Sequence, residues 1–242
     1  MAEAQEELGG VITLPNIGLK PRKTPCALTK KTLDNPKVQE GIASIKVQAK
    51  NTLTDLNVGE TGHKEMNDGT IVQATPVNNG HSIDFGNKSN SKGAHHNHTL
   101  TGIRMHSPAD INELLGFAVA QPTGTRNNTG NAYLGMIGAV HCATCPPDNV
   151  KYIHYIIRFN GTFQQAINYM FDDDVELIYE EIYKKIYDDL TKTTPSGGPS
   201  PYLNSTGGIN NQGLEKLFFD FLKKLTLIEI TLSCKELNRM VQ

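Results

Sequence analysis

The feature that most constrains the fold is the stretch from Lys92 to Ile111, which holds four of the chain's eight histidines. His96 and His98 flank a single residue, and strand side chains alternate between faces, so we expect both imidazoles on one face. A helix signal follows: Ser107 suits the N-cap, the next proline suits the first helical position, and Asp110 suits the first turn. The stretch therefore predicts a strand that leads into the N-terminus of a helix.

This pattern favours a metal site. Two imidazoles on one face of a strand can bind zinc at about 2.0–2.1 Å, and Asp110 can add a carboxylate oxygen. Three protein ligands leave one tetrahedral position open, which is typical of a catalytic zinc site and not of a structural one. His106 becomes a rival ligand if the loop after His98 displaces Asp110.

The same residues resemble the motif of the JAMM (JAB, or MPN-plus) metallopeptidases. That motif is His-x-His, a loop, and Ser-x-x-Asp, with a glutamate on an earlier strand. The matching positions are His96, His98, Ser107 and Asp110, and Glu60 is the candidate glutamate. The resemblance covers roughly residues 58–160.

The resemblance implies zinc-dependent hydrolysis of a peptide or isopeptide bond in a peptide or protein substrate. Glu60 would be the general base that deprotonates the activated water, and Ser107 would stabilise the oxyanion. Glu65 is the alternative glutamate, although on a regular strand it faces the side opposite to Glu60. The chain departs from the family at Thr99, where proline is usual, and in a gap before Ser107 that is one residue longer.

The whole chain predicts an α/β (α+β) fold. Residues 1–25 read as an irregular lead-in, 26–160 as the JAMM-like domain, and 161–242 as a helical extension with a possible last strand. The expected strands are 58–66, 70–77, 82–85, 93–98, 133–141, 150–159 and 227–232, and the expected helices are 36–50, 107–120, 164–171, 173–190 and 213–225. A mixed, mostly antiparallel sheet flanked by helices is a sandwich, and the resemblance implies the JAB/MPN-like (cytidine deaminase-like) form.

Composition excludes several classes of protein. A formal net charge of −2 shows no basic bias, so we expect no nucleic-acid partner. No apolar run reaches the roughly 18 residues of a membrane span, so we expect no membrane association. Residues 1–7 lack the features of a secretory signal peptide, which makes a cytoplasmic location the default, with non-classical export left open. The four cysteines are too few and too scattered for a disulfide framework, which fits a reducing compartment.

Other functions stay open at this point. The fold can serve as a catalytically inactive interaction scaffold, and His95-His-Asn-His98 is similar to HNH-type nuclease sites. Cys142 and Cys145 form a Cys-x-x-Cys pair that can bind a second metal, although no second pair completes four ligands. Bacterial relatives of the JAMM family trim peptides or ubiquitin-like modifiers, and no residue here selects a substrate or an oligomeric state.

Overall fold

The computed structural model describes residues 24–122, 128–194, 196–227 and 230–232. The strands are β1 (Gly62–Met66), β2 (Ile71–Gln73), β3 (Thr75–Val77), β4 (Ser82–Asp84), β5 (Ser91–Asn97), β6 (Tyr133–His141), β7 (Val150–Phe159) and β8 (Ile230–Leu232). The helices are α1 (Pro25–Leu33), α2 (Pro36–Asn51), α3 (Pro108–Val119), α4 (Phe163–Tyr169), α5 (Asp173–Thr191) and α6 (Asn211–Lys224), with 3-10 turns η1 (Asn78–Gly80) and η2 (Asn128–Asn131).

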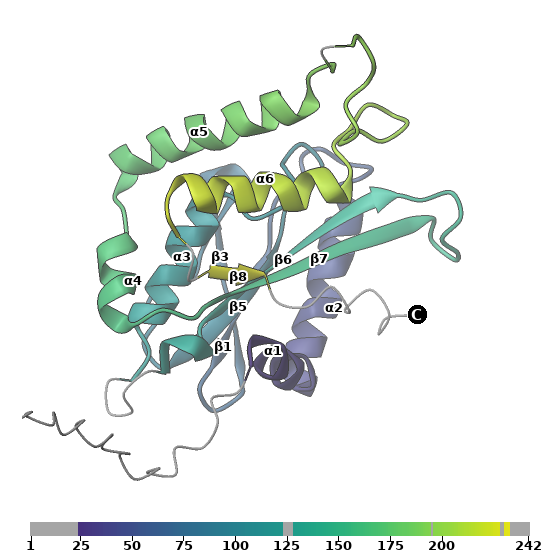
Figure 1. The fold of residues 1–242 in the computed structure, drawn as a ribbon. Helices are drawn as coiled ribbons and strands as arrows, with labels where there is room; N and C mark the ends of the chain where they lie inside the picture. The colour runs from purple at the N-terminus through teal and green to yellow at the C-terminus, as the bar shows by residue number, and fades with distance from the viewer. Residues whose placement is uncertain (1–23, 123–127, 195, 228–229, 233–242) are drawn as a thin grey trace, which may run out of the picture.

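Six of the strands form one sheet in the order β2-β1-β5-β6-β7-β8, and β3 and β4 form a second, small sheet (Figure 1). Neighbouring strands of the large sheet are antiparallel except β5 and β6, which are parallel. This confirms the predicted mixed, mostly antiparallel sheet flanked by helices. A parallel pair needs a crossover connection, and α3 lies in the crossover from β5 to β6. The end of β5 therefore leads directly to the start of α3.

Helices cover both faces of the large sheet. On one face, α2 packs through Val38 and Ile45 against Ile137 of β6. On the other face, Leu114 of α3 and Phe218 of α6 belong to one core, which also includes residues of the strands. The part of the chain after residue 160 contributes α4, α5, α6 and the edge strand β8. Within it, α6 packs beside α5 (Figure 1).

Local sequence signals account for much of this architecture. Asn35 caps α2 by accepting the Lys37 N–H at 3.0 Å, and Pro36 takes the first helical position, as predicted. The bounds of β6 and β7 equal the predicted strands. Helix α1 was not predicted: the sequence was expected to be irregular up to residue 25, and α1 starts there, at Pro25. Proline is compatible with this start, because at the first helical position it loses no hydrogen bond.

Two strand predictions are wrong in extent. The strand expected over 58–66 begins only at Gly62, because the Glu60 N–H bonds the Gly80 carbonyl at 2.6 Å and holds this segment against η1. The strand expected over 70–77 is split into β2 and β3. β3 pairs with β4, since β1 offers no residue before Gly62 for it to pair with.

Some expectations concern residues outside the described ranges. The lead-in over residues 1–25 lies there almost entirely, as does part of the strand expected over 227–232.

The cysteines differ from the expectation based on their spacing. Cys142 and Cys145 form a disulfide in the turn between β6 and β7, with Cα atoms 5.4 Å apart. The tight turn brings the two Cα atoms within the normal range for a disulfide. The pair therefore offers no thiolate for a second metal, and it does not support a reducing compartment.

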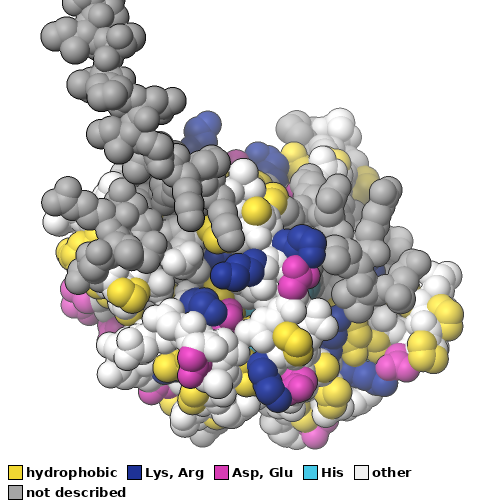
Figure 2. Space-filling model, turned by 90° about the horizontal axis from the view of Figure 1, so that it is seen from below, with side chains coloured by type: hydrophobic (Ala, Val, Ile, Leu, Met, Phe, Trp, Pro, Cys, Tyr) yellow, Lys and Arg dark blue, Asp and Glu magenta, His cyan; other side chains and the backbone are white. Residues whose placement is uncertain are grey.

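The described surface carries charges of both signs. Figure 2 shows Lys and Arg interspersed with Asp and Glu on the face seen from below. Pairs such as Lys50 and Asp148, 2.7 Å apart, account for part of this mixing. Among the described helices, none combines the length and the apolar composition that a membrane crossing requires.

Candidate metal centre

Two histidines reach one side of the sheet from the end of β5. His96 lies on the strand and His98 one residue beyond it, where the His98 N–H still bonds the Ile137 carbonyl at 3.0 Å. Pairing with β6 thus extends the strand geometry past Asn97. The two imidazoles turn to the same side, with ring centroids 4.9 Å apart.

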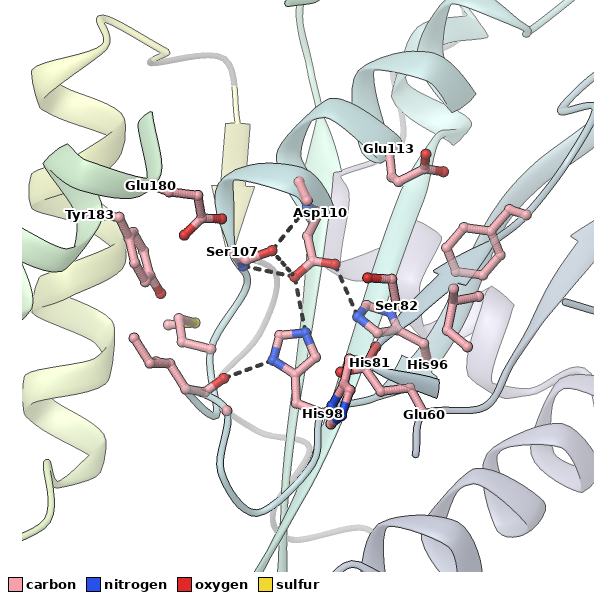
Figure 3. Close-up of a pocket in the computed structure, with 16 residues that line it drawn as sticks. Glu60, His81, Ser82, His96, His98, Ser107, Asp110, Glu113, Glu180 and Tyr183 are labelled. Carbon is pink, nitrogen blue, oxygen red and sulfur yellow. Dashed lines mark hydrogen bonds and ion pairs between the residues drawn. The ribbon is translucent and has the colours of Figure 1, made fainter. Parts of the chain in front are cut away.

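Asp110 meets both imidazoles from the first turn of α3. Its Oδ1 lies 3.0 Å from His96 Nε2, and its Oδ2 lies 3.2 Å from His98 Nε2 (Figure 3). A capping box fixes this carboxylate: Oδ2 accepts the Ser107 N–H at 2.7 Å, and the Ser107 hydroxyl accepts the Asp110 N–H at 3.2 Å. The longer loop before Ser107 therefore does not displace Asp110.

The three residues form a group that can hold a metal ion. One ligand atom from each of His96, His98 and Asp110 lies within 4.8 Å of the others, and all three residues are buried. Each imidazole lies next to a different oxygen of the Asp110 carboxylate, at 3.0 and 3.2 Å. All three side chains therefore face one point, as the ligands of a metal ion do. His106 is outside this group: it is fully buried, with Nδ1 3.7 Å from Asp110 Oδ2.

Hydrogen bonding orients the His98 ring for metal binding. His98 Nδ1 lies 2.7 Å from the Ile103 carbonyl oxygen. A carbonyl can only accept, so Nδ1 carries the proton and donates it. This leaves Nε2 as the nitrogen that a metal ion could use, and metal-binding histidines usually donate their other ring N–H in this way.

The electrostatics of the group favour a positive charge at its centre. Burial alone lowers the pKa of His98, but the Asp110 charge and hydrogen bond, together with Glu60, outweigh burial and raise this pKa to about 9. Burial raises the pKa of Asp110, but His96 and His98 outweigh it and hold that pKa well below its usual range. A divalent cation can take the place of the protons that the imidazoles share with the carboxylate.

Glu60 lies on the wall of the same pocket. The pocket has a volume of about 260 Å³ and is also lined by His96, His98, Asp110 and Ser107 (Figure 3). Burial raises the pKa of the Glu60 carboxyl, and the nearby His98 and His96 partly oppose this rise. Its proton affinity is therefore shifted toward the value that a proton-transfer group at neutral pH needs.

Glu65, the alternative glutamate, is not among the pocket residues. It is buried and accepts the Tyr133 hydroxyl at 2.9 Å, and it pairs with Lys92 at 2.8 Å. These contacts place Glu65 in a structural network.

Among the further residues that line the pocket, four are titratable and were not expected from the sequence: His81, Glu113, Glu180 and Tyr183. Glu113 follows Asp110 by three residues, and this helical spacing could have identified it. Glu180 and Tyr183 come from α5, and no local pattern predicts that α5 packs beside α3. The Tyr183 hydroxyl donates to the His106 carbonyl at 2.9 Å and ties α5 to the loop before Ser107.

Comparison with known proteins does not assign this site to a family. No protein-family model matches the sequence, and neither curated proteins nor solved structures give a match.

Proposed function

We propose that the protein is a zinc-dependent hydrolase of peptide or isopeptide bonds, of the JAMM type. The observation that carries this proposal is the convergence of His96, His98 and Asp110 in one buried group, with Glu60 on the wall of the same pocket. Glu60 is far from the others in sequence and comes from a separate segment. The resemblance to the JAMM motif predicts this combination of residues, and the geometry supports it.

The donor set fits zinc. Two imidazole nitrogens and one carboxylate oxygen are a common ligand set of catalytic zinc, and the pocket leaves room for a fourth ligand. The same donors also occur in non-haem iron sites, so the metal has to be measured. When bound, zinc supplies Lewis-acid activation of water and polarises a carbonyl group.

The proposed chemistry assigns separate roles to Glu60 and Ser107. Glu60 accepts a proton from the attacking water and passes it to the leaving amine, and the burial that raises its pKa favours the first of these steps. The Ser107 hydroxyl lies 3.1 Å from Asp110 Oδ2, to which it can donate. Its oxyanion role therefore requires the hydroxyl hydrogen to turn from Asp110 toward the substrate carbonyl.

The test combines metal analysis with a peptide-cleavage assay. Purified wild-type protein and its Glu60→Gln variant should both hold about one zinc per chain, whereas His96→Ala should lose it. Glu60→Gln should slow cleavage of a quenched-fluorescent peptide library by about 10²–10⁴-fold, the usual contribution of a general base. Glu40→Gln is the matched control, because Glu40 is an exposed residue of α2 that pairs with Lys37 and does not line the pocket.

Three results would contradict the proposal. Wild-type cleavage by Glu60→Gln would remove Glu60 from the mechanism. Wild-type protein that binds no metal would favour the inactive scaffold. Bound metal with no peptide cleavage, but with nicking of plasmid DNA, would favour the nuclease.

A further inference from the structure

We propose that the pocket prefers polypeptide substrates with a basic side chain next to the cleaved bond, and that Glu180 recognises this side chain. This inference rests on the proposed hydrolase function, because it names the substrate of the same pocket. Two features support it: the negative charges that line the pocket and the direction of the Glu180 side chain.

The pocket is rich in carboxylates. Glu60, Asp110, Glu113 and Glu180 line it, and none of its described lining residues is Lys or Arg. Asp110 is occupied by two imidazoles, and Glu113 pairs with Lys88 at 3.0 Å. Glu60 has its proposed role in proton transfer. Glu180 is the remaining acid without an assigned role.

Glu180 is surrounded mainly by other acids. Burial, Glu176 and Asp110 all raise the pKa of its carboxyl, and His98 is the one opposing charge. Lys184 stands four residues later, at the spacing that favours an ion pair on a helix, but no such pair is present in the described part of the chain. Figure 3 instead shows the Glu180 side chain directed from α5 toward Asp110 and Ser107.

The helix itself does not explain the position of Glu180. Acids in the first turn of α5, such as Asp173 and Asp174, interact favourably with the positive end of the helix dipole. Glu180 lies beyond that turn, where the effect has faded. Glu181 is its neighbour on the helix; both residues are exposed, but Glu181 does not line the pocket. The two residues are therefore a matched pair that differs in access to the pocket.

The shape and polarity of the pocket also suit a basic side chain. Apolar side chains line part of it, including Ile83, Phe85 and Met105. The methylene groups of Lys or Arg can pack on such a wall while the charged end reaches an exposed carboxylate. Tyr183 lies one turn after Glu180 and holds α5 through its bond to the His106 carbonyl. This bond holds the part of α5 that carries Glu180 beside the pocket.

In the experiment, the full-length protein cleaves a set of matched peptides and their rates are compared. Internally quenched peptides, acetylated at the N-terminus, differ at one residue beside the cleaved bond, which is Lys, norleucine or Glu. Norleucine keeps the aliphatic chain of Lys without its charge. A fourth peptide has norleucine and a free N-terminal amine, which distinguishes a basic side chain from a terminal amine as the recognised group.

We expect the Lys peptide to have a kcat/KM about two- to five-fold above that of the norleucine peptide, mainly through KM, since one exposed ion pair is worth this much. Glu180→Gln should abolish this preference, so that the Lys and norleucine peptides have equal kcat/KM. Glu181→Gln should keep the preference. Higher salt should reduce it, because salt screens exposed charges.

The outcomes separate this inference from the proposed function. Equal cleavage of Lys and norleucine peptides by the wild type would overturn the inference while leaving the hydrolase intact, as would a preference for the free amine. A Lys preference that survives in Glu180→Gln would remove Glu180 from recognition. If no peptide is cleaved, the hydrolase proposal fails. Fluorescence-anisotropy binding of labelled peptides then decides: tighter binding of Lys peptide that depends on Glu180 supports recognition, and equal binding overturns it.

Discussion

Zinc binding to His96, His98 and Asp110 should release protons and should strengthen as the pH rises. Zinc binds neutral imidazole, so a protonated ligand must first lose its proton. The Asp110 charge keeps the pKa of His98 at about 9, so His98 is almost fully protonated at pH 7. Each zinc ion should therefore displace about one proton from His98 at this pH.

The size of the effect follows from this pKa. Between pH 7 and 9 the neutral fraction of His98 should rise from about 1% to about 50%, so the apparent affinity should rise about 50-fold, which corresponds to about 2.3 kcal/mol. Above pH 9 the rise from His98 should end, because its neutral form is then dominant. A histidine with an ordinary pKa near 6.5 would show almost no change over the same range.

Isothermal titration calorimetry in buffers with different ionisation enthalpies counts the released protons, and chelator competition measures affinity from pH 6 to 9. Asp110→Asn removes the charge that raises the His98 pKa, so it should bind zinc more weakly and release fewer protons. His81→Gln is the control, since His81 lines the pocket but is outside the metal-binding group. An affinity that stays constant from pH 7 to 9, with no proton released, would refute the reasoning.

Two further predictions concern the opposite face of the sheet. Burial lowers the pKa of His63 to about 4, below its unfolded value of about 6.5, so folding stability should be lost as the pH falls from about 6.5 to 4, by up to about 3 kcal/mol. Urea unfolding at several pH values should show this loss, and a smaller pH dependence in His63→Gln. Gly135→Ala should lower the melting temperature, because a Cβ there would lie 2.1 Å from the His95 ring, and such overpacking costs about 1–3 kcal/mol. An unchanged melting temperature would show that the His95 ring can move aside.

Much of the fold follows from local patterns in the chain. The cap at Asn35, the proline after it and the apolar run in residues 133–141 each act over a few neighbouring positions, and they predict α2 and β6 within a residue or two. His96, His98 and Asp110 are also predictable as a set, because strand alternation and a capped first helical turn orient their side chains. These features depend on backbone geometry that a short segment determines alone.

The surroundings of the site depend on contacts between distant segments. Glu60 reaches the pocket from an irregular segment held by the Gly80 carbonyl, and Glu180 reaches it only because α5 packs beside α3. Glu65 has the same side chain as Glu60, yet Tyr133 and Lys92 bind it within the structure. Local sequence cannot distinguish these glutamates, because the partners that raise, lower or neutralise their charge come from elsewhere in the chain. The chain thus specifies its candidate metal ligands mainly through local sequence, whereas packing decides which acids stand beside them.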